Sequence, residues 1–359
     1  MGDRDTRPAT SVRTEVRDSL GELAPAWDAL VDGSARPSPF LCSWWLEAVA
    51  AGTPTFVLVF DGDELLGGVP LVEDRRRGVR RYRLATAGSE HGLDVVATPG
   101  RTDEVGDAVG AWLNRPGNRI VDLSGVRPAN SLASCAPPTA RVETLETAPW
   151  FDVPPTFEDY LASRRKKFRQ EIRRTGRRFE EMGARYRVVD TVDTDRALAT
   201  LERLHEQRWD RHSLFRVFFH QFEAAARAGA ARGEVRFHEV DVHGEVIASL
   251  ATIERGGTCY FFQVGRNPDR RWSNVGTVLY SNVVERACSE GFRKIDLCYG
   301  ESASKLLWAD HREPVARVHW GHGPAGRAAD WALTALWPAA DALRRLRLRG
   351  ARRQPASAD

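Results

Sequence analysis

The chain has 359 residues, of which 42% are hydrophobic, 28% charged and 9% aromatic. This composition excludes disordered and fibrous proteins, and the length exceeds what one ordinary core requires, so we expect two domains of roughly 150 residues each. The net charge is only +3, and such a balance argues against a protein that coats nucleic acid.

No window of the sequence holds the roughly 18 consecutive apolar residues that a membrane span requires. The charged start Met1–Asp5 lacks the apolar core of a signal peptide. The five cysteines are scattered and form no Cys-x-x-Cys pair, which is typical of reduced, mostly buried thiols. We therefore expect a soluble protein of the cytoplasm.

The first half predicts short helices alternating with strands. Helices are expected at 20–31, 44–51 and 103–114, and strands at 55–60, 65–73, 82–85, 93–97 and 120–123. Small and turn residues between Gly125 and Pro138, and prolines at 149, 154 and 155, mark the passage into the second half. The outer segments 1–11 and 351–359 are predicted to be frayed.

The second half predicts a clearer mixed α/β pattern. Helices are expected at 156–183, 195–212, 216–231 and 275–291, and strands at 186–189, 235–242, 246–253, 258–264, 294–298 and 315–320. The helix at 275–291 would cross from one strand to a neighbour. Such sheets bind ligands at the carboxyl ends of strands and at helix N-termini, so we expect the chemistry at 262–278 and 296–308.

Four segments of the second half occur in a recognisable order. They are the basic helix Ser163–Thr175, the helical segment Leu204–Trp209, the turn Ser273–Gly276 and the strand and loop Asp296–Lys305. Together they resemble the GNAT acyltransferase superfamily, in the branch of the CelD-like acetyltransferases of cellulose biosynthesis and the FemAB aminoacyl transferases. The segment His91–Gly100 resembles the amino-terminal lobe of that branch.

The resemblance implies an α/β fold of two tandem GNAT-like lobes, each a mixed, mostly antiparallel sheet flanked by helices. A degenerate lobe would span 12–150, an acyltransferase lobe 151–324, and an amphipathic helical segment 325–350. FemAB ligases that use aminoacyl-tRNA commonly insert a long helical hairpin in the second lobe. The interval Gly183–Asp195 holds only a strand and a turn, which favours acyl-CoA, most simply acetyl-CoA, as the donor.

The donor would be held where a strand and loop give way to a helix. Free backbone N–H groups of a first helical turn can bind a pyrophosphate. Asn274 occupies a position that is usually glycine in the superfamily, and asparagine tolerates the left-handed backbone. The candidate donor-binding residues are Arg266, Arg271, Ser273, Asn274, Val275 and Gly276. The alternative is that Ser273 or Asn274 only caps a structural helix.

The reacting centre would follow the strand that ends near Asp296. Glu301 could take a proton from the attacking group and Tyr299 could give one to the leaving thiolate. Lys305, one of only four lysines, could stabilise an oxyanion or bind an anionic acceptor. The alternative is that Asp296 caps a helix or that Glu301 and Lys305 form an exposed pair.

The acceptor would lie against helices. The resemblance implies that His205, Arg208 and Trp209 border the acceptor cleft, with His205 as a possible base, although a lone helical histidine often only packs. Nine basic residues between 164 and 178 face the single acid Glu171. This density favours an anionic partner, which could be CoA, an acidic acceptor, a phospholipid surface or RNA. A solvated helix is the alternative.

Lys166 and Arg169 of this basic helix are the candidate substrate-binding residues. Tyr280 is a second candidate acid, but its spacing predicts a core contact. His311, His319 and His322 do not form a convincing zinc pattern, so no metal is predicted. Trp331 and the basic end Leu343–Arg349 could lie on an anionic membrane surface, or the tryptophan face could dock on the second lobe.

We therefore expect an acyl-CoA-dependent N- or O-acyltransferase that works by direct attack of an amine or hydroxyl on the thioester. Its acceptor would be a small molecule or a saccharide. One alternative is an aminoacyl-tRNA-dependent transferase with the same fold. The other is a non-catalytic binding protein whose donor site has decayed, because Asn274 replaces the usual glycine.

Overall fold

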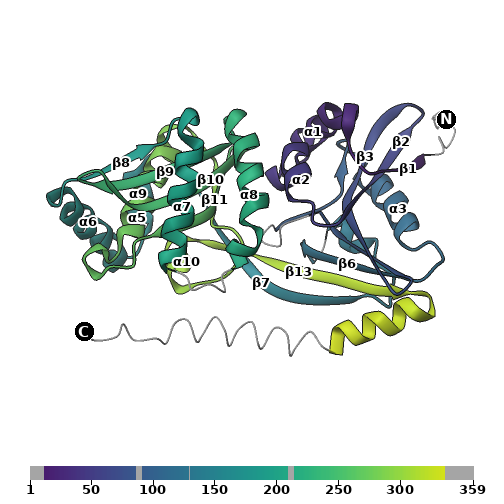
Figure 1. The fold of residues 1–359 in the computed structure, drawn as a ribbon. Helices are drawn as coiled ribbons and strands as arrows, with labels where there is room; N and C mark the ends of the chain where they lie inside the picture. The colour runs from purple at the N-terminus through teal and green to yellow at the C-terminus, as the bar shows by residue number, and fades with distance from the viewer. Residues whose placement is uncertain (1–11, 86–90, 129, 209–213, 336–359) are drawn as a thin grey trace. The chain divides into compact units, whose positions relative to one another are not determined.

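The computed structural model describes residues 12–85, 91–128, 130–208 and 214–335 (Figure 1). The predicted tails 1–11 and 351–359, and most of the segment 325–350, lie outside these residues. The chain divides into two compact units. The first contains the residues up to Leu145 together with Val315–Ala332, and the second contains Glu146–Pro314 and the residues after 332.

The first unit is a sheet with helices packed on it. Its elements are β1 (Arg13–Arg17), α1 (Ala24–Gly33), α2 (Ser43–Val49), β2 (Thr53–Asp61), β3 (Glu64–Arg76), β4 (Val79–Leu84), β5 (Val96–Ala97), α3 (Thr102–Leu113), β6 (Arg119–Val126) and α4 (Ser131–Ser134). The strand order is β1-β2-β3-β4-β6-β13, and β5 pairs with β3. Only β4 and β6 run parallel among the paired strands described for this unit.

The second unit repeats this plan. Its elements are β7 (Arg141–Asp152), α5 (Phe157–Ser163), α6 (Lys166–Glu181), β8 (Ala184–Val188), α7 (Thr194–Arg208), α8 (Leu214–Ala231), β9 (Val235–Val242), β10 (Glu245–Arg255), β11 (Thr258–Arg266), α9 (Val275–Ser289), β12 (Lys294–Asp296), α10 (Ala303–Trp308) and β13 (His311–His322). The strand order is β7-β12-β11-β10-β9-β8. Only β11 and β12 run parallel among these pairs. The predicted mixed α/β class is confirmed.

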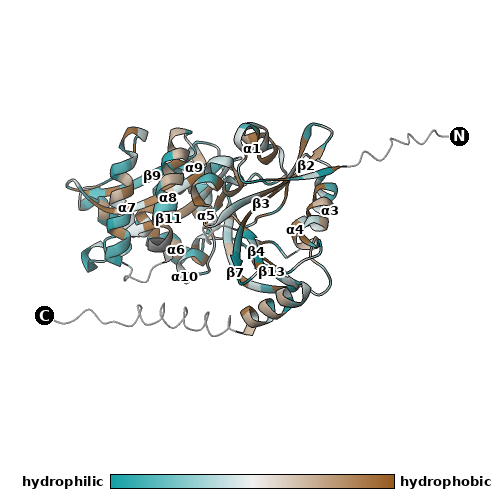
Figure 2. Cartoon of the chain, turned by 45° about the vertical axis from the view of Figure 1, so that its right-hand side comes forward, coloured by the Kyte–Doolittle hydropathy of each residue, from teal (hydrophilic) through white to brown (hydrophobic). Residues whose placement is uncertain are grey.

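Helices cover both faces of the second sheet (Figure 1). Phe261 of β11 packs on Tyr280 of α9, whereas its neighbour Phe262 stacks on Phe222 of α8. Because successive strand residues point to opposite faces, α9 and α8 lie on opposite sides. Figure 2 shows helices striped with hydrophobic and hydrophilic residues, as expected for amphipathic helices that cover a sheet.

Each unit contains the last strand of the other repeat. The series β1 to β4, α3, β6, α4 and β7 has the same order as β8 to β11, α9, β12, α10 and β13. However, β7 pairs with β12 and β13 pairs with β6. Residues 315–324, which were predicted in the second lobe, therefore group with the first unit, and the chain passes between units inside β7 rather than at residue 150.

Two predicted elements differ from the structure. The helix expected at 156–183 is two helices, because Arg164 takes an extended backbone (ψ 154°) and ends α5. The loop expected after Cys298 contains α10, whose first turn is capped by the Ser302 hydroxyl accepting from the Lys305 N–H. The strand β7 was not predicted. All five cysteines are free thiols, and four of them are buried, as expected.

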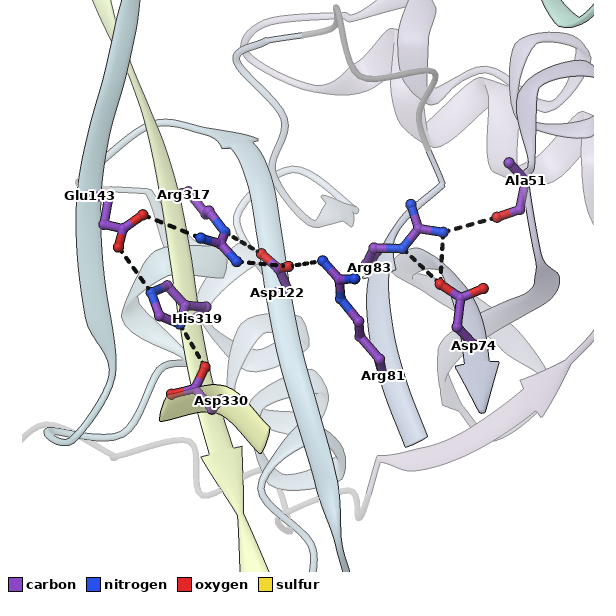
Figure 3. A network of polar contacts seen from close by, with 9 residues as sticks. All are labelled: Ala51, Asp74, Arg81, Arg83, Asp122, Glu143, Arg317, His319 and Asp330. Carbon is purple, nitrogen blue, oxygen red and sulfur yellow. Dashed lines mark hydrogen bonds and ion pairs between the residues drawn. The ribbon is translucent and has the colours of Figure 1, made fainter. Parts of the chain in front are cut away.

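A buried ion-pair network ties β13 into the first unit (Figure 3). Arg317 of β13 donates to both carboxylate oxygens of Asp122 on β6, at 2.6 and 3.0 Å, and contacts Glu143 at 3.3 Å. Arg81 of β4 also binds Asp122. His319 lies between Asp330 at 2.7 Å and Glu143 at 3.3 Å. Both nitrogens of this ring therefore face carboxylates.

Asp122→Ala should reduce the free energy of unfolding of the first unit by about 3–5 kcal/mol, because it removes the buried bidentate partner of the Arg317 guanidinium, whose contact with Glu143 is longer. Asp74→Ala is the matched control, since the Asp74–Arg83 pair in the same view is about one-third exposed and should contribute ~1 kcal/mol or less. Urea unfolding measures both. Equal losses in the two variants would contradict the structural role assigned to Asp122.

Candidate active site

The parallel strands β11 and β12 separate soon after they pair. β12 pairs with β11 only from Thr258–Lys294 to Tyr260–Asp296, while β11 continues beside β10 as far as Arg266. Among the strands that the structure describes, none pairs with this side of β11 beyond Tyr260. Backbone polar groups must be satisfied by some partner, so this edge of β11 offers hydrogen-bonding groups to a ligand.

The helix α9 begins just after this open edge. Asn274 precedes it with a left-handed backbone (φ 66°, ψ 15°) and makes no side-chain cap hydrogen bond. The Ser273 hydroxyl donates instead to the Arg270 carbonyl at 2.6 Å. The structure therefore confirms that asparagine keeps the left-handed turn, and it does not support the alternative of side-chain capping by these two residues.

The predicted donor residues lie together on this turn or next to it in the chain. The backbone N–H groups of Val275 and Gly276 have no acceptor within the described part of the chain. Arg271 is ion-paired with Asp269 at 3.1 Å. Arg266 at the end of β11 has no ion-pair partner among the described residues. The turn is thus a helix N-terminus with free donors and several arginines, which is the arrangement that binds phosphates.

The basic helix α6 contacts both ends of the candidate site. Arg178 donates a hydrogen bond to the carbonyl of Ser273. Ser273 directly precedes the turn Asn274–Gly276, which is called the donor turn below. At the other end of the helix, Phe168 packs edge-on against Trp308 of α10, with ring centroids 5.2 Å apart. Arg169 donates to three backbone carbonyls where α5 meets α6. Its side chain therefore holds the backbone of this corner in place. Lys166 is exposed and has no partner among the described residues.

The loop after β12 is built on Asp296 and Lys305. The buried Asp296 accepts from the Cys298 N–H at 2.9 Å and pairs with Lys294 at 2.9 Å. The Lys305 ammonium donates to the carbonyls of Cys298 and Tyr299 at 3.2 and 3.0 Å. Burial lowers the pKa of Lys305. Asp296 caps no helix, and both side chains hold the shape of the loop.

Glu301 binds partners that the sequence did not identify. Its carboxylate accepts from the Thr147 hydroxyl at 2.7 Å and pairs with Arg312 at 3.2 Å. Its N–H donates to Glu146 at 3.2 Å. The alternative pair of Glu301 with Lys305 does not form, because Glu301 precedes α10 and points toward β7. The signal for Thr147 would have been the strand β7, which the prolines around it obscured.

The helix α7 packs tightly on β11. A Cβ added at Gly265 would lie 2.9 Å from the Leu201 carbonyl oxygen and from the Leu204 Cβ, so glycine permits this close approach. It brings His205 against the strand. Burial, reinforced by the charge of Arg208, lowers the pKa of His205 to about 4. This imidazole is neutral at pH 7 but is a weak base for an ammonium. Trp209 lies outside the described residues.

Tyr280 packs in the core, as its spacing predicted. Its ring lies edge-on to Phe261 at 4.9 Å and to Trp308 at 5.6 Å between centroids. Burial raises the pKa of Tyr280 to about 12. The hydroxyl has no hydrogen-bond partner within the described part of the chain, so it keeps its proton and is able to donate it.

The comparisons with known proteins identify a domain in the second unit. The family model for the acetyltransferase (GNAT) domain matches residues 166–306, from α6 through the start of α10. This stretch is therefore similar to a GNAT acetyltransferase domain, and it contains the site residues that the sequence predicted. A search of curated proteins found no match.

Solved structures share the fold over most of the chain. The crystal structure of FemX has a TM-score of 0.62 at 10% identity, with 86% of this chain and 97% of that chain covered. The C-terminal domain of a putative lysylphosphatidylglycerol synthetase from Agrobacterium fabrum has a TM-score of 0.55 at 11% identity, with 89% and 97% covered. L-PGS from Bacillus licheniformis has a TM-score of 0.53 at 12% identity, with 83% and 90% covered. At these identities the likeness shows fold alone.

His205 should remain neutral down to about pH 4. Its folded-state pKa lies below the usual 6.5, so this group supports stability above pH 6.5 and loses that support as the pH falls toward 4. Histidine NMR resonances measured from pH 7 to pH 4, compared with a His205→Gln variant, identify its titration. A midpoint near 6.5 would contradict the buried environment.

Proposed function

We propose that the protein is an acyl-CoA-dependent N- or O-acyltransferase, most simply an acetyltransferase, in which an amine or hydroxyl attacks the thioester directly. One observation carries the proposal. The parted strands β11 and β12 expose a backbone edge, and the left-handed turn at Asn274 opens a helix N-terminus next to it. This arrangement provides hydrogen bonds for an extended donor and a site for its phosphates.

In this proposal Val275 and Gly276 bind the pyrophosphate through backbone N–H groups, and Arg266 and Arg271 add positive charge. Glu301 accepts the proton of the attacking group, directly or through water, and is held for this role by Thr147 and Arg312. Protonated tyrosines, Tyr299 on the loop or Tyr280 on α9, supply a proton to the leaving thiolate. No step requires a metal or a covalent enzyme intermediate.

The main roles proposed for Asp296 and Lys305 are positional. Both hold the loop that carries Tyr299 and Glu301. The Lys305 ammonium uses two of its three hydrogens for carbonyls, and the third is available to an oxyanion or an anionic acceptor. We place His205 and Arg208, with Lys166 of α6, along the acceptor side. His205 serves there as a neutral hydrogen-bonding group, because its low pKa suits it poorly to general-base catalysis.

An aminoacyl-tRNA donor is the second candidate. The exposed residues Arg165, Lys166, Lys167, Arg174 and Arg177 have no ion-pair partners among the described residues, and such a surface fits a polyanion. The shared fold with FemX and with a lysylphosphatidylglycerol synthetase domain is compatible with it. Against it, the interval 183–195 holds only β8 and a 3₁₀ turn. The intact left-handed turn at Asn274 argues against the other alternative, a non-catalytic protein with a decayed donor site.

Acetyl-CoA at about 100 times its dissociation constant should stabilise the second unit by ~2.7 kcal/mol, which corresponds to a rise of about 5–10 °C in its melting temperature. Gly276→Trp should abolish the rise by filling the space above the donor turn. Gly276→Ala should retain it, since a Cβ at Gly276 meets no atom within 4 Å.

No rise with acetyl-CoA or free CoA at millimolar concentration would reject the acyl-CoA proposal. RNA binding that weakens steeply with salt would then favour the aminoacyl-tRNA donor, and a flat salt profile would remove that donor too.

We also propose peripheral contact with anionic membranes through the helical residues 323–335. Trp331 on this helix is 66% exposed, while its neighbour Asp330 holds the helix to His319. An exposed tryptophan beside a basic segment suits a lipid surface.

Trp331→Ala should reduce co-sedimentation with phosphatidylglycerol vesicles at least about threefold, because the indole supplies much of the interfacial affinity. Val192→Ala, which changes another highly exposed apolar residue, should leave sedimentation unchanged. Equal binding to phosphatidylcholine vesicles, or no effect of the tryptophan substitution, would reject the contact.

A further inference from the structure

The second unit has a pocket that the proposed acyl transfer does not use. It has a volume of about 350 Å³ and lies between α5, α6, β8, β9 and α9. Its apolar floor consists of Leu161, Ile172, Phe179, Val240 and Val278. The α9 residues that line it are Val278, Ser281, Asn282 and Glu285, and none of them belongs to the turn Asn274–Gly276 at the start of the helix. The pocket is therefore separate from the turn at Asn274–Gly276.

Gly176 keeps this pocket open. It lies in the interior of α6, where glycine costs about 1 kcal/mol relative to alanine. A Cβ added at this position would meet no atom within 4 Å, so no close packing requires the glycine. Gly176 lines the pocket, and the absence of a side chain at this position leaves space there.

A buried hydrogen-bond chain ends at Tyr186 in the wall of the pocket. The Glu254 carboxylate is ion-paired with Arg286 at 2.6 Å and accepts from the Thr252 hydroxyl at 3.1 Å. Thr252 must then accept from Nε2–H of His238 at 3.0 Å. This tautomer leaves Nδ1 of His238 to accept the Tyr186 proton at 2.8 Å.

The direction of this chain determines what Tyr186 offers to a ligand. Burial lowers the pKa of His238 and raises the pKa of Tyr186, so both groups stay neutral at pH 7. Because the only hydroxyl hydrogen of Tyr186 is given to His238, its oxygen presents lone pairs alone. A ligand group that meets this oxygen must be a donor.

The pocket rim carries both signs of charge. Arg173 is paired with Glu158 at 2.7 Å. Arg177 and Arg185 have no ion-pair partner within the described part of the chain, and the same holds for Glu180 and Glu285 there. All four line the pocket. All four are exposed at the rim. A ligand with one charge can pair with only one sign of these charges, whereas a zwitterion can pair with both.

We propose that this pocket binds a free α-amino acid with an apolar side chain. The side chain lies on the apolar floor, the carboxylate pairs with Arg177 and Arg185, and the ammonium donates to the Tyr186 oxygen and pairs with the rim acids. An amino acid of this size fits a volume of about 350 Å³ with room for water. The proposal does not depend on the identity of the acyl donor.

Calorimetric titration of the full chain with L-leucine tests the proposal. The isosteric probes are 4-methylpentanoate, which lacks the ammonium, and 3-methylbutylamine, which lacks the carboxylate. Leucine should bind. Each probe should bind with an affinity at least about tenfold lower, because each leaves one set of rim charges unpaired. Equal binding of either probe would overturn the requirement for a zwitterion. No binding of L-leucine or L-phenylalanine at about 10 mM would overturn the proposal.

Variants of Gly176 assign the binding to this pocket. Gly176→Phe should abolish leucine binding by filling the space, and Gly176→Ala should retain it. Both should fold, since the position has no close neighbour, and circular dichroism checks this. Tyr186→Phe should weaken leucine about tenfold through the lost acceptor. Leucine binding that survives Gly176→Phe overturns the assignment, and an acetyl-CoA response that persists in this variant shows that the donor site is separate.

Discussion

The short parallel pairing of β11 with β12 is the constraint on which the candidate site depends. Three residue pairs hold the strands together, after which β12 turns away through Asp296 and β11 continues to Arg266. The separation exposes an edge of β11 and gives the loop after β12 a direction of its own. Lys305 then fixes this loop through two carbonyls. A longer pairing would close this edge of β11.

Local signals in the sequence predicted much of the second unit but not its long-range partners. The strands β9 to β11, the helix α9 and the left-handed Asn274 follow from periodicity, turn residues and backbone preference. The contacts of Glu301 with Thr147 and Arg312 join residues from three separate segments, and no local pattern encodes them. The boundary at 150 was displaced because β7 contains Pro149 and because β13 pairs outside its own repeat.

The basic residues in and just before α6 divide into those that bind other parts of the protein and those that do not. Arg169, Arg173 and Arg178 of α6, together with Arg164 just before it, bind carbonyls or acids of neighbouring elements and hold the helix in place. The remaining basic side chains face solvent. Much of the charge density that suggested an anionic partner therefore has a structural role. The same helix contacts Ser273 beside the turn Asn274–Gly276. It also lines the separate pocket at Gly176.

The exchange of the last strands has a consequence for synthesis on the ribosome. The first unit lacks its β13 strand until residue 322 has been made and has left the exit tunnel, so β6 keeps an unpaired edge during most of translation. The buried Asp122 has to wait for Arg317 over a separation of 195 residues. Such an edge is prone to wrong pairing. The edge of β6 is therefore open to such wrong pairing until β13 has been made.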